Sequence, residues 1–167
     1  MLNAYCRKGP GTNYHIITYL QAGTFYDIVA NNGLKGRYAW WLIEVPGGFT
    51  CWMGGLSSTR GPIQKVPDVT PPPLPQKPSY FNVTSLCDRN APSLSIDLEW
   101  PQAQNVTGYN LYRNGSLLAV ISPDGKYFLR FSDRTAPLYI NVVYQLVPFN
   151  DYGETAGVSA TVDSCAD

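Results

Sequence analysis

The sequence predicts an all-β fold, and three observations lead to this class. No window of about 11 residues shows the helical period of about 3.6 residues. Short runs rich in β-branched and aromatic residues alternate instead with glycine, proline and asparagine turn signals. Seven prolines within residues 61–78 separate two such regions. We therefore expect one small β-domain over residues 1–60 and a second over residues 79–167.

Three runs in the first region are strand candidates: residues 24–30, 38–45 and 49–55. Asn-Asn-Gly and Pro-Gly-Gly separate these runs and predict turns between them. This spacing is typical of a small antiparallel sheet.

The second region shows the clearest alternation of the chain. Residues 94–100 place four apolar side chains on one face and three polar ones on the other. Asn114-Gly115 is a strong hairpin signal, and further turns are expected at residues 123–125 and 150–153. About seven strands at this spacing predict a β-sandwich.

Residues 61–78 cannot form a helix or a central strand, because proline lacks the N–H donor. Such a segment favours the polyproline II conformation and acts as a semi-rigid spacer. A ligand segment for an SH3 domain is the alternative interpretation.

The composition excludes several classes of function. The formal net charge is zero and charged residues make up 14%, against roughly 25% in an average protein. We therefore expect neither a nucleic-acid binder nor a polybasic membrane anchor. No apolar run is long enough for a membrane span, and no signal-peptide pattern is visible, so we expect a mature form or a fragment.

The chain has four cysteines, Cys6, Cys51, Cys87 and Cys165, and no CxxC pair. Widely spaced cysteines in an even number predict two disulfides and an oxidising compartment; buried free thiols are the alternative. Three sequons support a secreted chain weakly. The candidate N-glycosylation sites are Asn82, Asn105 and Asn114.

Residues 4–56 resemble a bacterial SH3 (SH3b) domain. Gly-Pro-Gly-Thr with a following tyrosine at residues 9–14, and Ile-Ile with a following Leu and Gly at residues 16–23, match its opening motifs in order. Tryptophan-containing strands at residues 41–45 and 51–53 match its later ones. The resemblance implies a small barrel, and for some members a peptidoglycan ligand.

Residues 79–165 resemble a fibronectin type III domain. The matching residues are Trp100-Pro101, Tyr109-x-Leu111 and Tyr144-x-Leu146-x-Pro148-x-Asn150-x-x-Gly153. The resemblance implies a seven-strand Ig-like or fibronectin III-like sandwich in which Tyr144 occupies the tyrosine-corner position.

These two resemblances imply the disulfide pairing. In the SH3b pattern the positions of Cys6 and Cys51 usually hold other residues, and both depart together, so we expect a Cys6–Cys51 bond. In the sandwich, the first and last strands run in the same direction. Cys87 and Cys165 follow these strands and should meet at one pole.

The sequence offers no catalytic constellation, and we expect no enzyme, no metal site and no cofactor. His15 is the single histidine and falls in a loop where a surface residue is ordinary. Asp97 and Glu99 are spaced as glycosidase carboxylates could be, but their clean alternation favours a solvated strand face. No nucleotide-binding or metal-binding motif occurs.

Aromatic residues are the stronger functional signal. Tyr14, Tyr38 and Trp40 are candidates for a recognition face, with Tyr5 and Tyr19 nearby in the pattern. The alternative is that half of these side chains fill a small core. Trp100, Tyr109 and Tyr144 are predicted core residues of the sandwich.

We therefore expect a non-catalytic extracellular or cell-surface protein with a structural or adhesive role. Its partners would be copies of itself or other surface proteins, and its neutral surface and edge strands favour a filament. A monomeric fragment of a longer surface protein is the alternative to assembly. The alternative function is a cell-wall targeting module, in which the SH3b-like domain binds peptidoglycan and the sandwich is a spacer.

Overall fold

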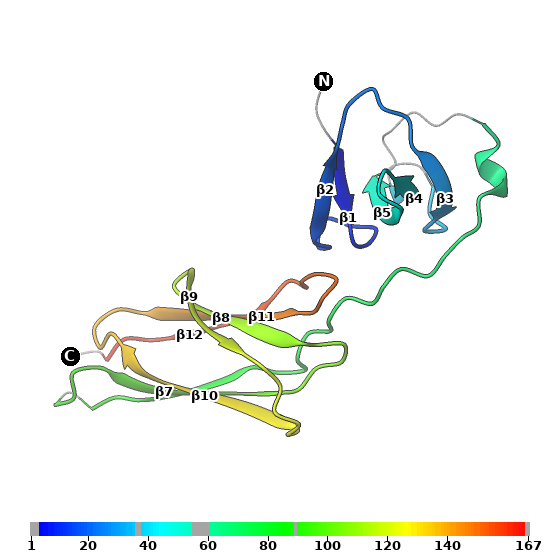
Figure 1. Ribbon diagram of the computed structural model, residues 1–167. Coiled ribbons are helices and arrows are strands. Elements are labelled where there is room, and N and C mark those ends of the chain that lie inside the picture. Colours follow the sequence, from blue (N-terminus) through cyan, green and yellow to red (C-terminus); the bar gives the residue numbers. More distant parts are fainter. Residues whose placement is uncertain (1–3, 36–37, 55–60, 89, 166–167) are drawn as a thin grey trace. The chain divides into compact units, whose positions relative to one another are not determined.

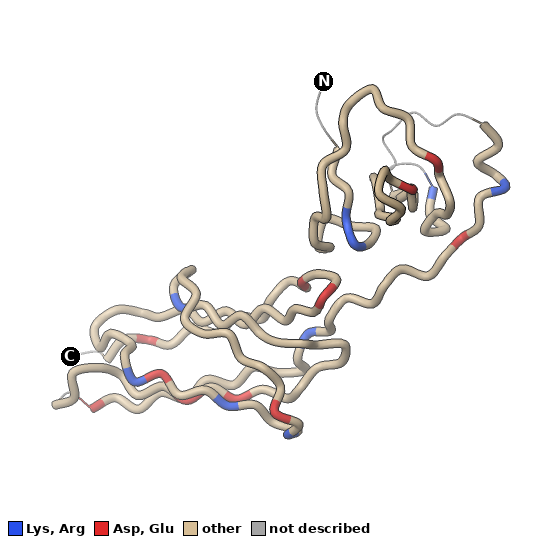
Figure 2. Tube along the Cα trace, in the orientation of Figure 1, with Lys and Arg blue, Asp and Glu red and all other residues tan. Residues whose placement is uncertain are grey.

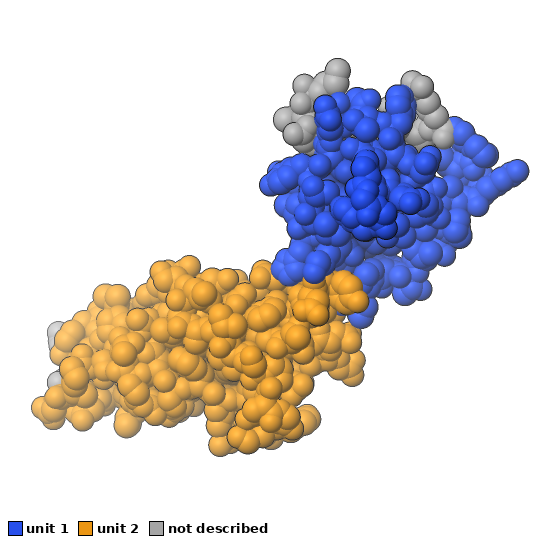
Figure 3. Space-filling view, in the orientation of Figure 1, with its two compact units in different colours: residues 1–73 blue, residues 74–167 orange. Residues whose placement is uncertain are grey.

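The computed structural model describes residues 4–35, 38–54, 61–88 and 90–165. The chain forms two compact units, residues 1–73 and 74–167, and the described part is almost entirely β-structure (Figures 1 and 3). The all-β prediction is thereby confirmed.

Unit 1 is a five-stranded antiparallel sheet in the order β2-β1-β5-β4-β3 (Figure 1). Two glycines with positive φ, Gly47 at 106° and Gly48 at 78°, make the tight turn between β4 and β5. The strand β3 begins later than the sequence predicts, because Gly23 (φ 83°) opens a turn that delays it. The strands are β1 (Ala4–Arg7), β2 (Ile16–Leu20), β3 (Asp27–Asn31), β4 (Trp40–Val45) and β5 (Phe49–Gly54).

The core of unit 1 is small and contains a disulfide. Cys6 on β1 and Cys51 on β5 are bonded, with their Cα atoms 5.5 Å apart. Both cysteines are fully buried among Leu20, Ile43 and Val45. A sheet of this size buries little apolar surface, so the covalent bond is a large part of its stability.

The proline-rich segment, predicted to be a semi-rigid spacer, is divided between the two units at Pro73 and Leu74. Residues 66–73, which we call the strap, are hydrogen-bonded within unit 1, and a parallel bridge pairs Asn31 of β3 with Asp68. Pro75 and Gln76 belong to unit 2, where their carbonyl and N–H bond Thr155 and Gln104. The expectation of no helix fails for one 3-10 turn, η2 (Ile63–Lys65), which contains no proline.

Unit 2 is a fibronectin III-like β-sandwich of seven strands among the described residues. One sheet has the order β10-β7-β6 and the other β12-β11-β8-β9. Asn114 (φ 49°) and Gly115 (φ 80°) form the predicted turn between β8 and β9. The strands are β6 (Asn82–Leu86), β7 (Leu94–Pro101), β8 (Gly108–Arg113), β9 (Ser116–Ile121), β10 (Phe128–Ala136), β11 (Val142–Phe149) and β12 (Val158–Val162).

Inward-facing residues of both sheets fill the core of unit 2. Trp100 on β7 packs edge-on against Tyr109 on β8, with ring centroids 5.7 Å apart, and both are fully buried. The Tyr109 hydroxyl accepts a hydrogen bond from the Ala103 N–H. Because the predicted core residues alternate along their strands, their side chains meet between the two sheets.

A buried carboxylate links the two sheets and corrects the tyrosine-corner expectation. The Tyr144 hydroxyl on β11 donates to Asp133 on β10 at 2.7 Å, rather than to a nearby backbone group. Arg113 on β8 donates to the same oxygen at 2.7 Å, and Thr135 donates to the other oxygen. The Asp133 side chain is 2% exposed, and these donors satisfy it.

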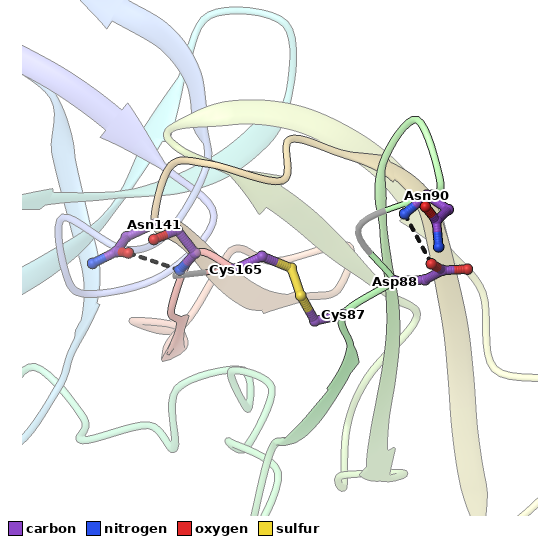
Figure 4. The surroundings of a disulfide bond; sticks show 6 residues. Cys87, Asp88, Asn90, Asn141 and Cys165 are labelled. Atoms are coloured by element: carbon purple, nitrogen blue, oxygen red, sulfur yellow. Dashed lines mark hydrogen bonds between the residues drawn. A yellow bond between two sulfur atoms is a disulfide. The ribbon is translucent and has the colours of Figure 1, made fainter. Parts of the chain in front are cut away.

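The second disulfide joins strand ends rather than the core centre. Cys87 follows β6, Cys165 follows β12, and their Cα atoms are 5.9 Å apart (Figure 4). Local hydrogen bonds hold both flanks: Asn90 N–H donates to Asp88, and Ser164 N–H donates to Asn141. The first and last strands of the sandwich thus meet at one pole.

Candidate functional site

Four exposed large hydrophobic side chains of unit 1 lie on the hairpin of β1 and β2. We call Tyr5, Ile16, Ile17 and Tyr19 the hairpin face. All four are large hydrophobic side chains in water, with exposed fractions of 40% for Ile17 and 64% for Tyr19. The Tyr5 and Tyr19 rings are paired across the strands, with centroids 5.4 Å apart. Exposed apolar patches of this kind are typical of contact surfaces.

A β-bulge produces the exposure of both isoleucines. Cys6 pairs with Thr18 and Arg7 pairs with Ile16, so Ile17 is the extra residue on β2. Bulges redirect side chains, and here neither isoleucine enters the core. Because β2 is also an outermost strand of the sheet, the hairpin face adjoins a backbone edge that no described strand pairs with.

One arginine orders the base of the hairpin. The Arg7 guanidinium lies 5.3 Å from the centre of the Tyr5 ring and donates to the carbonyls of Thr12 and Tyr14. In Figure 2 the hairpin is tan except for one basic stretch. The hairpin face is thus apolar and aromatic, and the Arg7 guanidinium beside it is held by backbone carbonyls and the Tyr5 ring.

The prediction that Tyr14 lies on an exposed recognition face is wrong for the folded chain. Its side chain is only 8% exposed, and its hydroxyl donates to the Pro72 carbonyl at 2.7 Å. Its ring lies so close to Gly9 that a Cβ there would come within 2.1 Å. Burial accordingly raises the pKa of the Tyr14 phenol.

Tyr38 lies just before β4, and Trp40 is the first residue of β4. The Asn32 side chain ties them: its Nδ2 donates to the Tyr38 carbonyl, and its Oδ1 accepts the Trp40 N–H. Tyr38 is 59% exposed, whereas Trp40 is half-buried with its ring over Gly54. These two residues remain candidates for recognition.

The residues considered for catalysis lie in ordinary structural settings. His15 is exposed beside β2. Asp97 and Glu99 on β7 pair with Arg134 and Arg130 on β10 at 2.9 and 2.7 Å, and Figure 2 shows these alternating charges. Hydrogen bonds from Ser132 and Arg134 lower the pKa of Asp97, which favours its charged form. The described residues contain no cluster of three metal-binding side chains.

The three sequon asparagines are all exposed in unit 2. Asn82 lies on the edge strand β6. Asn105 and Asn114 adopt positive φ at turns, and the Asn114 Oδ1 accepts the Val143 N–H. Glycosylation at these positions stays a prediction.

Sequence reasoning missed the two isoleucines of the hairpin face. The run of two isoleucines breaks the alternation of β2, and such a break is the available signal of a bulge. The docked strap was also missed, because its contacts use backbone atoms that carry no sequence signal.

Comparison with known proteins gives a partial structural likeness. No family model matches the sequence, and no curated protein matches it. One solved structure, "Structure of FN3tt mut", is 17% identical over 55% of this chain and 97% of that chain, with a TM-score of 0.45. Another, "Crystal Structure of FN3tt", is 17% identical over 56% of this chain and 99% of that chain, with a TM-score of 0.43.

Proposed function

We propose that this chain is a non-catalytic extracellular or cell-surface protein with a structural or adhesive role, and that it assembles with copies of itself. The observation that carries the proposal is the hairpin face, an exposed apolar patch of Tyr5, Ile16, Ile17 and Tyr19 beside the outermost described strand of the sheet. Tyrosine and large apolar side chains are typical of the centre of protein contacts.

Charge and covalent structure support this role. The formal net charge is zero, so two copies of the chain do not repel each other through net charge. Soluble monomers usually carry a net charge away from zero. The two disulfides are compatible with an extracellular or secreted protein. No helix in the described part of the chain is long and apolar enough to cross a membrane.

Light scattering over a wide range of protein concentration tests self-assembly. We expect the mean mass of the wild-type chain to rise with concentration, and fibres to appear by electron microscopy if the contact is head-to-tail. Ile17→Lys and Tyr19→Lys should each reduce the rise, because a lysine in a buried contact is costly.

Leu117→Lys is the matched control, since it places the same charge on the exposed edge strand β9 of unit 2. It should behave as the wild type. A constant monomer mass for the wild type, or an equal effect of all three substitutions, would contradict the role of the hairpin face.

A second candidate function is peptidoglycan targeting by unit 1. The observation in its favour is the exposed Tyr38 beside the half-buried Trp40. In a sedimentation assay with purified peptidoglycan, Tyr38→Ala and Trp40→Ala should weaken binding while the thermal midpoint stays nearly unchanged. Wall binding without self-association would favour this function over assembly.

A further inference from the structure

The strap, residues 66–73, occupies a defined surface of unit 1. The Asn31 N–H donates to the Pro67 carbonyl at 2.9 Å, and the Val69 N–H donates to the Asn31 carbonyl at 2.9 Å. The Asn31 side chain adds a bond from Nδ2 to the Val66 carbonyl at 3.1 Å. Asn31 thus holds the strap from both its backbone and its side chain.

A second anchor lies further along the strap. The Tyr14 hydroxyl donates to the Pro72 carbonyl at 2.7 Å. Gly9 makes room for the Tyr14 ring, because any larger residue there would collide with it. The surface therefore consists of two separated anchors, Asn31 and Tyr14, built into different loops and strands of unit 1.

These anchors bind backbone atoms of the strap. They contact the carbonyls of Val66, Pro67 and Pro72 and the N–H of Val69. Such contacts recognise an extended backbone and do not select particular side chains. The prolines of the strap, two of them at contacted positions, hold a peptide extended in advance and so lower the entropic cost of binding.

We propose that unit 1 carries a binding surface for extended, proline-containing peptides of partner proteins, and that the strap occupies this surface in the resting chain. This surface is separate from the hairpin face and goes beyond the proposed role in assembly. A tethered strap acts at an effective concentration on the order of millimolar, so a free peptide binds well only when the strap is displaced.

The test uses the full chain and a fluorescent peptide with the sequence of residues 65–75, measured by fluorescence anisotropy. Val69→Pro removes the one strap N–H that bonds Asn31, and a second variant replaces residues 66–73 by a Gly/Ser segment of equal length. Both variants should bind the peptide at least about tenfold more tightly than the wild type, because their internal competitor is weakened or absent.

Thr70→Pro is the matched control, because Thr70 makes no hydrogen bond in the described part of the chain. It should bind the peptide as weakly as the wild type. In the Gly/Ser chain, Tyr14→Phe should lower peptide affinity by about tenfold, the loss expected for one hydrogen bond in a closed site.

Amide hydrogen exchange shows whether unit 1 stays folded in the Gly/Ser chain. If the Gly/Ser chain keeps unit 1 folded, absence of peptide binding at millimolar concentration overturns the proposal. If unit 1 opens in that chain, added peptide must restore the protection of the β4 and β5 amides, and failure to restore it also overturns the proposal.

Discussion

The two units of this chain are both small β-folds, but different interactions stabilise them. Among the described residues, the core cluster of unit 1 has five buried members, two of which are Cys6 and Cys51. The cluster of unit 2 has fourteen, and only Cys165 belongs to a disulfide. Unit 1 therefore depends on a covalent bond at its centre, and unit 2 depends on packing and on a buried polar network.

This difference predicts that removing the disulfide has more serious consequences for unit 1 than for unit 2. Closing a loop across the 45 residues between Cys6 and Cys51 contributes about 4 kcal/mol in the chain-entropy model. The bond between Cys87 and Cys165 spans 78 residues and contributes a similar amount. What differs is the stability that remains after each bond is removed.

The largest expected effect follows from the double substitution Cys6→Ala, Cys51→Ala. Losing about 4 kcal/mol and opening a cavity in a five-residue core should unfold unit 1 at room temperature. Hydrogen exchange measured by mass spectrometry should show rapid exchange over β4 and β5, with β7 and β11 still protected.

Cys87→Ala, Cys165→Ala is the matched control. It should lower the stability of unit 2 but leave it folded, because the other thirteen buried residues of its core are unchanged. If unit 2 unfolds as readily as unit 1, the contrast between covalent and packed cores is wrong.

Asp133→Asn should have the next largest effect, and only on unit 2. An amide keeps one acceptor oxygen and brings N–H donors against the donors of Arg113 and Tyr144 or those of Thr135, which leaves buried groups unsatisfied. We expect a loss of about 2–4 kcal/mol in the free energy of unfolding, measured with urea and unit-specific exchange. Asp97→Asn, on the exposed face, should change little.

The same network predicts a dependence of unit 2 on pH. Burial alone would raise the pKa of Asp133, but hydrogen bonds from Tyr144, Thr135 and Arg113 outweigh it and lower the pKa. A lowered folded pKa gives stability that is present above the unfolded value of about 3.9 and is lost as pH falls below it.

For Tyr144 the dependence of stability on pH has the opposite direction. Burial and its bond to Asp133 raise the pKa of this phenol, so its contribution is present below pH about 10 and is lost as pH rises further. The urea midpoint of unit 2 should fall at acid pH and at alkaline pH. In the Asp133→Asn variant, the fall at acid pH should be smaller. An unchanged acid side in that variant would contradict the assignment.

Tyr14→Phe should have the smallest effect, confined to unit 1. It removes the bond to the Pro72 carbonyl and should cost about 1 kcal/mol. Tyr19→Phe, on the exposed hairpin face, is the comparison and should leave the thermal midpoint unchanged. Equal midpoints for the two variants would show that the Tyr14–Pro72 bond does not stabilise unit 1.

The sequence predicts those features that repeat along a strand. Alternation over residues 94–100 and the Asn114-Gly115 turn fixed the face and the hairpin correctly, because local geometry determines both. Asp133 follows Leu129 and Phe131 at spacing two, which places it on the core face, but spacing does not reveal its donors.

The features that sequence reasoning missed depend on contacts between distant segments. Tyr14 is adjacent to a glycine-rich turn and resembled a surface residue until the strap was seen to bind it. The bulge at Ile17 likewise depends on how β1 and β2 align. The hairpin face is therefore visible only in the folded chain.

Hydrogen exchange of the β2 amides at low and high protein concentration tests the proposed assembly most directly. If copies meet at the hairpin face, exchange over Ile16–Leu20 should slow as concentration rises, while exchange over the edge strand β9 stays constant. Concentration-independent exchange over β2, or slowing confined to β9, would contradict the claim that this face joins one copy to the next.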